Sequence, residues 1–154
     1  NPQGLIVDAP TQTIWMTEHG PKGGDELNQI TAGKNYGWPA ITYGVDYSGA
    51  IISPFTEAPG MEQPVTYWVP SIATSGLALY TSDAMPELKG KLLVGGLKSK
   101  SVVAVDVSRD EARVSEPFPG FEGRVRDVRM LNDGSIAVID EEAGKVVRIS
   151  AGAD

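Results

Sequence analysis

Hydrophobic and polar residues alternate over short runs towards the end of the sequence. The runs DVRML, SIAVID and KVVRI occupy residues 127–131, 135–140 and 145–149. Asn132-Asp133-Gly134 separates the first two runs, and residues 141–144 separate the last two. Alternation with a period of two is typical of strands with one buried face, and such short Gly-containing connections are typical of hairpin turns. Residues 127–149 therefore predict three antiparallel strands.

The same plan occurs in two earlier parts of the chain. Residues 4–30 contain GLIVD, TIWMTE and ELNQI, and residues 76–107 contain GLALY, KLLVGGL and VVAVDV. The three copies begin at Gly4, Gly76 and Asp127, and the 51 residues between the last two starts are close to the roughly 40–50 residues of a propeller blade. Helical periodicity is weak throughout. We therefore expect an all-β fold of the β-propeller type, with about three blades.

Three blades do not close a ring, because propellers usually have about four to eight blades. An open arc would leave sheet edges unprotected, so we expect either that two copies pair or that the chain is half of a larger protein. The sequence begins at Asn1 with no leader, as if cut from a longer chain. A single β-sandwich of about ten strands is the alternative fold.

Residues 40–70 differ from the strand-like copies on either side of them. They are rich in Pro, Gly, Tyr and Ser and show little periodicity. We expect a long surface excursion within the single domain of residues 1–154, serving as a lid or a subunit contact.

Composition narrows the possible partners. With 41% hydrophobic residues, 154 residues can bury a sizeable core. The formal net charge of −7 repels phosphate backbones, so we expect no nucleic-acid partner. The sequence has no cysteine, which excludes disulfides and thiolate chemistry. No apolar run approaches the roughly 20 residues of a membrane helix, so we expect no membrane insertion.

Candidate chemistry begins in the stretch TEHGPKGGDELNQITAGKNYGWP, residues 17–39. His19 is the only histidine, and the Gly20-Pro21 step that follows offers backbone carbonyls suited to a hard cation such as calcium. Asp25 and Glu26 could add carboxylate oxygens to such a site. The alternatives are a turn with a surface imidazole and a pair of solvated acids.

Three basic residues stand out in the later part of this acidic chain. Lys98 follows KLLVGGL, and Arg124 and Arg126 flank Val125. Alternate residues of a strand face the same way, so the two guanidinium groups can form a fork for carboxylates, with Lys98 joining from the previous blade. The alternative is a solvated basic edge that deters aggregation.

Serine hydrolases and nucleotide-binding proteins are disfavoured, because the sequence lacks their motifs. Thr74-Ser75-Gly76 is not a Gly-x-Ser-x-Gly elbow, and no second histidine exists to complete a serine hydrolase. The Gly23-Gly24 and Gly95-Gly96 pairs lack the spacings of nucleotide-binding loops.

The motifs resemble the soluble pyrroloquinoline quinone (PQQ) dependent sugar dehydrogenases of the glucose/sorbosone dehydrogenase family, most closely the aldose sugar dehydrogenase branch. The resembling segments occur in family order: NPQGL (1–5), TEHGPKGGDELN (17–28), GKNYGWP (33–39), IATSGLALY (72–80), KLLVGGLKS (91–99) and GRVRDVRMLNDGSIAVID (123–140). The resemblance implies a six-bladed β-propeller, of which this chain would be the C-terminal half. It also implies a periplasmic or secreted location.

The resemblance implies roles for ten residues around PQQ and calcium. Lys98, Arg124 and Arg126 match basic residues that hold the carboxylates and quinone oxygens of PQQ, and Asn1, His19 and Ser75 match polar neighbours of the cofactor. Gly20 and Pro21 match carbonyl ligands of the active-site calcium, and Glu26 and Tyr36 match positions at a second, structural calcium. Thr74 departs from the family, where proline is common.

The implied activity is oxidation of an aldose sugar to a lactone, with hydride passing from the anomeric carbon to the quinone. The family's general-base histidine belongs to the N-terminal half, so we assign no catalytic residue here and expect the chain to be inactive alone. Its partners would be the aldose and either the missing half or a second copy. The alternatives are a non-catalytic binding module of two paired half rings and a calcium-dependent lactonase.

Overall fold

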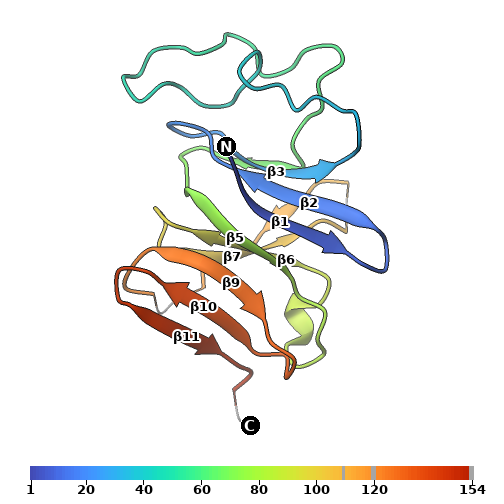
Figure 1. Ribbon diagram of the computed structural model, residues 1–154, viewed down its shortest axis with the longest axis vertical. Coiled ribbons are helices and arrows are strands. Elements are labelled where there is room, and N and C mark those ends of the chain that lie inside the picture. Colours follow the sequence, from blue (N-terminus) through green and yellow to red (C-terminus); the bar gives the residue numbers. More distant parts are fainter. Residues whose placement is uncertain (109, 119–120, 153–154) are drawn as a thin grey trace. The chain divides into compact units, whose positions relative to one another are not determined.

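A computed structural model describes residues 1–108, 110–118 and 121–152, and these residues form three antiparallel sheets (Figure 1). The only helix among them is a single 3-10 turn at Pro86–Leu88. No helix in this part of the chain is long and apolar enough to cross a bilayer. The expectation of an all-β fold is confirmed.

The first sheet contains the earliest of the three predicted copies. Its order is β1 (Pro2–Asp8), β2 (Thr13–Glu18), β3 (Asp25–Ile30) and β4 (Thr66–Trp68), each antiparallel to the next. In β2, Trp15 and Thr17 are buried while their neighbours are partly exposed, which is the period-two pattern expected for this segment. Thr17 Oγ1 accepts a hydrogen bond of 3.0 Å from Gly4 N at the irregular start of β1.

The segment between β3 and β4 is irregular. Residues 31–65 form turns and bends with two isolated bridges, Lys22 with Val45 and Asn35 with Met61. The excursion expected at residues 40–70 is therefore interrupted by β4, which pairs with β3. Tyr67 of β4 stacks on Tyr43, with ring centroids 3.7 Å apart, so the excursion is attached to the sheet.

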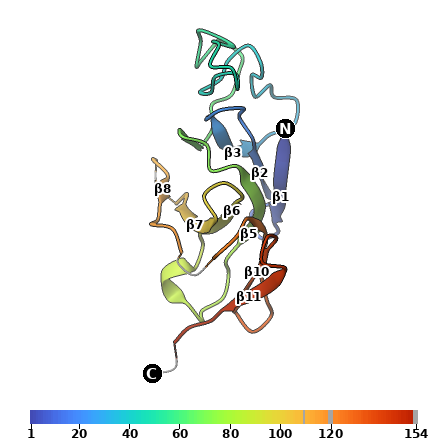
Figure 2. The same ribbon diagram turned by 90° about the vertical axis from the view of Figure 1, so that its left-hand side faces the viewer.

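The later two copies form two further sheets. One has the order β5 (Thr74–Leu79), β6 (Leu92–Gly96), β7 (Ser101–Asp106) and β8 (Arg113–Val114). The other has the order β11 (Lys145–Ile149), β10 (Ile136–Asp140) and β9 (Val125–Met130). Figure 2 shows the short β8 beside β7 at the edge of its sheet. The three sheets correspond to the three predicted blades.

The chain divides into two compact units, Asn1–Thr74 and Ser75–Asp154. The first contains the β1–β4 sheet, and the second contains both later sheets apart from the first residue of β5. Every residue of β6 is buried, which explains why its sequence is a continuous apolar and glycine run rather than an alternating one. The apolar core of the second unit comprises Ala78, Tyr80, Met85, Leu88, Leu93, Val102, Ala104, Val125, Val128, Ile136 and Val138.

Candidate functional site

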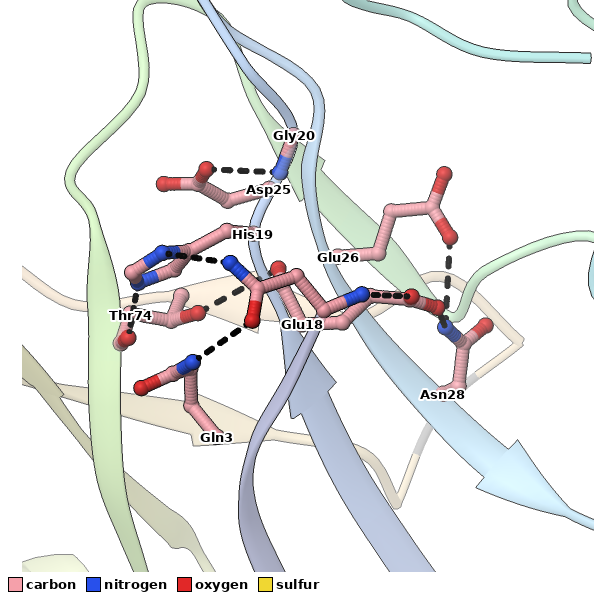
Figure 3. Close-up of polar contacts among 9 residues, drawn as sticks. Gln3, Glu18, His19, Gly20, Asp25, Glu26, Asn28 and Thr74 are labelled. Carbon is pink, nitrogen blue, oxygen red and sulfur yellow. Dashed lines mark hydrogen bonds and ion pairs between the residues drawn. The ribbon is translucent and has the colours of Figure 1, made fainter. Parts of the chain in front are cut away.

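His19 follows β2 directly and uses both of its ring nitrogens within the first unit (Figure 3). Its Nε2 lies 2.6 Å from the carbonyl oxygen of Thr74, and its Nδ1 lies 3.5 Å from Asn1 Nδ2. A carbonyl only accepts, so Nε2 carries the hydrogen and Nδ1 is the acceptor for the amide. The short Nε2 contact with the Thr74 carbonyl therefore fixes the ring, and the longer contact of Nδ1 with the Asn1 amide is secondary.

Asp25 is a buried carboxylate that holds two loops together. Its Oδ1 accepts a hydrogen bond from Gly20 N at 3.0 Å, while Oδ2 accepts bonds from Ser71 Oγ at 2.7 Å and Ala73 N at 2.6 Å. From the sequence, Asp25 and Glu26 are both expected to supply oxygens to a metal ion. Both oxygens of Asp25 instead accept hydrogen bonds from protein donors, and the bond from Gly20 N holds the start of the loop that carries the two expected carbonyl ligands.

Gly20 and Pro21 lie in a tightly folded loop between β2 and β3. A Cβ atom on Gly20 would lie 2.1 Å from the carbonyl oxygen of Gly23 and 2.5 Å from the carbonyl carbon of Gly24. No side chain fits there, so the loop requires glycine at position 20. Together with Asp25, this close approach restricts the backbone that carries the two predicted carbonyl ligands.

Glu18 and Glu26 are register partners on β2 and β3, and they share one hydrogen-bond donor. Asn28 Nδ2 donates to Glu18 Oε1 at 3.0 Å and to Glu26 Oε2 at 3.2 Å (Figure 3). Asn28 is fully buried, and its Oδ1 has no hydrogen-bond partner among the described residues. The pKa of Glu26 is raised to about 7, mainly by burial and to a smaller extent by the nearby Glu18 carboxylate, against the opposing effect of the Asn28 hydrogen bond.

This pair of acids, Glu18 and Glu26, has the chemistry of a cation-binding site. Glu18, Glu26 and Tyr36 line a cavity of about 10 Å³, roughly the room for one water molecule or ion. Tyr36 uses its hydroxyl to accept from Thr31 N at 2.7 Å and to donate to Gln29 O at 2.9 Å, so only its backbone carbonyl could be a ligand.

The metal would need more than acidic side chains. No group of three His, Cys, Asp or Glu side chains in the described part of the chain is arranged to hold a metal ion. Calcium accepts carboxylate and backbone carbonyl oxygens together, in six- to eight-fold coordination. Two carboxylates in an electron-rich, partly buried cavity therefore fit calcium, provided that backbone oxygens and water complete the shell.

In the second unit, Arg124 and Arg126 lie on either side of the buried Val125, at the start of β9, and both are exposed. Arg126 donates from Nε and Nη2 to Glu141 Oε2, at 2.9 and 2.6 Å. Lys98 follows β6 and is also exposed. No acidic side chain of the described residues pairs with Lys98 or Arg124, so both cations are available to an anionic ligand.

Buried polar groups fix the backbone around the two arginines. Asp140 is buried and accepts hydrogen bonds from Gly123 N at 3.0 Å, Glu122 N at 3.2 Å and Ala143 N at 3.2 Å. Burial acts to raise the pKa of Asp140, but these backbone donors outweigh it and bring the pKa below its ordinary value. The carboxylate therefore stays ionised and holds the turn that enters Arg124.

Ser75 fixes the backbone of Val125, the residue between the two arginines. It is buried, and its Oγ donates to the carbonyl oxygen of Val125 at 2.7 Å. A Cβ atom on Gly95 would lie 2.6 Å from Ser75 Oγ and 2.9 Å from Val125 Cγ1, so glycine is needed where β6 meets this contact. The predicted cofactor neighbour therefore has a visible structural role in supporting the arginine pair.

The predicted site residues fall into two groups. Those of the first unit are Asn1, His19, Gly20, Pro21, Glu26 and Tyr36, and those of the second are Ser75, Lys98, Arg124 and Arg126. Within each group the structure brings side chains and loops together as described above. That both groups hold one ligand stays a prediction.

Comparison with known proteins identifies the family. Residues 1–148 match the model of the Glucose / Sorbosone dehydrogenase family. The chain belongs to this family. Within the glucose/sorbosone dehydrogenases, it is 42% identical over 154 residues to aldose sugar dehydrogenase YliI of Escherichia coli strain K12, covering 97% of this chain but 42% of that protein. The chain thus spans about two fifths of this relative's length.

Solved structures of related enzymes share the fold. The soluble aldose sugar dehydrogenase of Escherichia coli in its apo form matches with a TM-score of 0.88 and 40% identity, over 96% of this chain and 44% of that one. The PQQ-bound aldose sugar dehydrogenase of Streptomyces coelicolor matches with a TM-score of 0.68 and 25% identity, over 96% and 42%. The predicted fold class is confirmed: the chain supplies part of a β-propeller.

Proposed function

We propose that this chain is the cofactor- and calcium-binding part of a PQQ-dependent aldose sugar dehydrogenase. The chain is related over nearly its whole length to aldose sugar dehydrogenases, one of which has been solved with PQQ bound. The observation that carries the proposal is that this chain exposes Arg124 and Arg126 at the start of a strand whose backbone is held in place. A planar guanidinium pair is suited to carboxylates, which PQQ carries. A periplasmic or secreted location belongs to the same proposal.

The residues of this chain would bind and orient PQQ. Lys98, Arg124 and Arg126 would hold the carboxylates and quinone oxygens of the cofactor, and Asn1 and His19 would border it. PQQ, when bound, supplies the acceptor for the hydride that leaves the anomeric carbon of the sugar. His19 donates from Nε2 to Thr74 O, so its part would be to orient polar groups rather than to remove the sugar's hydroxyl proton.

Calcium would have two places in this part of the protein. The carbonyls of Gly20 and Pro21 would hold an ion at the cofactor, where it would act as a Lewis acid. Glu26 and the Tyr36 carbonyl would hold a structural ion, and the shared Asn28 donor, the raised pKa of Glu26 and the small cavity support this assignment. Ionisation of Glu26 would then follow from the binding of the cation.

The experiment is a pair of measurements on the 154-residue chain and on the full-length protein. Isothermal titration with PQQ, with and without calcium, should show calcium-dependent binding that is lost in an Arg124→Ala, Arg126→Ala double variant. A dye-linked assay should detect aldose oxidation by the full-length protein only. Brisk sugar oxidation by the isolated chain would contradict the expectation that it lacks the general base. Hydrolysis of lactones that persists in the double variant would favour a lactonase.

A further inference from the structure

A second feature of the first unit is a shallow hollow next to His19 with a volume of about 210 Å³. It is lined by Asn1, His19, Gly20, Pro21, Trp38 and Tyr47. The first four are predicted site residues, whereas Trp38 and Tyr47 have no predicted role. These two aromatic residues are 54% and 76% exposed, although both belong to otherwise ordered turns.

The turn that carries Trp38 is closed by its own backbone. Gly37 has a φ of +94°, which favours glycine, and its N–H donates to Asn35 Oδ1 at 2.9 Å. The Gly37 carbonyl accepts from Ala40 N at 2.7 Å and Ile41 N at 3.1 Å. A Cβ atom on Gly37 would lie 2.1 Å from Ile41 Cγ1. Trp38 is therefore presented from a fixed position.

The turn that carries Tyr47 is held in a similar way. Lys22 N donates to Val45 O at 3.1 Å, which joins this turn to the loop after Pro21. Asp46 Oδ1 then accepts from Ser48 N at 2.8 Å and Ser48 Oγ at 2.6 Å, closing the turn around Tyr47.

Glycines let the loop after Pro21 and the loop before Tyr47 touch at the backbone. A Cβ atom on Gly24 would lie 2.5 Å from Gly44 N, and one on Gly44 would lie 2.2 Å from the carbonyl oxygen of Gly23. This contact and the Lys22–Val45 bridge connect the Gly20–Pro21 loop directly to the turn of Tyr47. Exposed aromatic side chains on such fixed backbone are suited to binding a ligand, because little conformational entropy is lost when they make contact.

The side of the hollow that Trp38 and Tyr47 form suits a small neutral ring beside the cofactor. Its lining includes no Lys or Arg among the described residues, so it offers no partner for the carboxylates of PQQ. It is smaller than the roughly 300–1,000 Å³ of pockets for drug-sized ligands. The aromatic faces can cover the C–H groups of a sugar ring, while the Asn1 amide and the backbone carbonyls can bond to hydroxyls.

We propose that Trp38 and Tyr47 form a platform on which the aldose ring rests beside His19, and that they help to determine sugar affinity. This inference rests on the proposed function and adds to it a substrate contact supplied by this part of the protein. Both residues would act on substrate binding and not on the transfer of hydride, so their loss should raise KM far more than it changes kcat.

The test uses the full-length, PQQ-loaded protein with glucose and other aldoses. Trp38→Ala and Tyr47→Ala should each raise KM about five- to tenfold, with kcat within about twofold of the wild type, because loss of a stacked ring corresponds to a modest loss of binding energy. Trp38→Phe and Tyr47→Phe should restore most of the affinity. Phe55→Ala is the matched control: Phe55 is 62% exposed on the same excursion and does not line the hollow.

A second readout guards against variants that are damaged in folding. The fluorescence of Trp38 is obtained by subtracting the signal of Trp38→Phe from that of the wild type, and titration with aldose should quench it. The affinity for PQQ should be unchanged in all five variants. An unchanged KM in Trp38→Ala and Tyr47→Ala, with PQQ still bound, would overturn the platform and leave the proposed function standing. A full-length wild type that neither binds PQQ nor oxidises aldoses would overturn the proposed function itself.

Discussion

The two units of the chain prepare their ligand groups in different ways. In Asn1–Thr74 the predicted groups are mainly backbone carbonyls and acids in or next to loops, and the buried carboxylate of Asp25 ties those loops together. In Ser75–Asp154 they are mainly exposed cations beside strands whose opposite faces are apolar. The oxygen site depends on one polar hub, Asp25, whereas the cation site combines strand alternation and apolar packing with the buried Asp140 and Ser75. Replacing the supporting residues and the predicted ligand residues of each unit, and measuring stability and ligand affinity, can test this difference between the units.

The largest effect is expected from the hub of the first unit. Asp25→Ala would leave Gly20 N, Ala73 N and Ser71 Oγ without their acceptor in a buried place. We expect a loss of about 3–5 kcal/mol in the free energy of unfolding, measured by urea denaturation of the full-length protein. Asp25→Asn, which keeps one acceptor, should lose clearly less. Equal stability of Asp25→Ala and the wild type would show that the loops do not depend on this hub.

The next effect concerns the cations of the second unit. Arg126→Ala should weaken PQQ binding roughly 10- to 100-fold, the value of a charge-assisted contact of about 1.5–3 kcal/mol. Glu141→Gln should act in the opposite direction, because Glu141 occupies Arg126 Nε and Nη2 and would compete with the cofactor's carboxylate.

Arg129→Ala is the control for this pair of variants, since Arg129 is an exposed arginine of the same strand that pairs with Asp127. Fluorescence or calorimetric titration gives the affinities. Tighter PQQ binding by Arg126→Ala, or equal losses in Arg126→Ala and Arg129→Ala, would contradict the assignment.

A smaller effect is the pH dependence of calcium binding in the first unit. The pKa of Glu26, about 7 in the folded protein, lies above its ordinary value of 4.5, so the metal-free fold loses stability as pH rises through this range. Calcium binds the ionised carboxylate. Its affinity should therefore rise roughly tenfold per pH unit below 7 and level off above it.

Isothermal titration with calcium between pH 5 and 8 checks this dependence. Glu26→Gln should bind calcium weakly with little change over the same range, while its metal-free form should stay stable up to pH 8. An affinity in the wild type that does not vary with pH would remove Glu26 from the ligand set.

The smallest effect compares neighbouring hydroxyls of the two units. Ser75→Ala removes the 2.7 Å hydrogen bond to the Val125 carbonyl and should lower the free energy of unfolding by about 1–2 kcal/mol. It should also weaken PQQ binding. Thr74 Oγ1 makes a longer bond of 3.3 Å to the Glu18 carbonyl in the first unit, so Thr74→Ser should change stability by less than about 1 kcal/mol. Thermal unfolding in parallel measures both; the reverse order would mean that Ser75 does not support the arginine strand.

The strands were largely predictable from the sequence because their alternation and turn residues are local signals. The predicted run at residues 13–18 coincides with β2, and the three runs of residues 127–149 correspond to β9, β10 and β11. The short strands β4 and β8 were missed. Strands of three and two residues carry no usable periodicity, and they exist only because β3 and β7 offer them an edge.

The sequence suggests candidate chemistry where one residue type in one place is informative, as for Gly20-Pro21 and for the alternating Arg124 and Arg126, and these assignments stay predictions. The supporting residues were not predictable from the sequence. Asp25 and Asp140 look like ordinary turn acids in the sequence, and their roles come from donors such as Ala73 N, 48 residues away along the chain. Only the folded backbone shows which distant donors meet a given carboxylate.

A crystal structure of the full-length protein with PQQ and calcium tests the central claim most directly. The account predicts that the carboxylates and quinone oxygens of PQQ lie within hydrogen-bond distance of Lys98, Arg124 and Arg126, while the carbonyls of Gly20 and Pro21 coordinate a calcium ion beside the same cofactor. PQQ bound away from these cations, or calcium at the cofactor without either carbonyl, would contradict it.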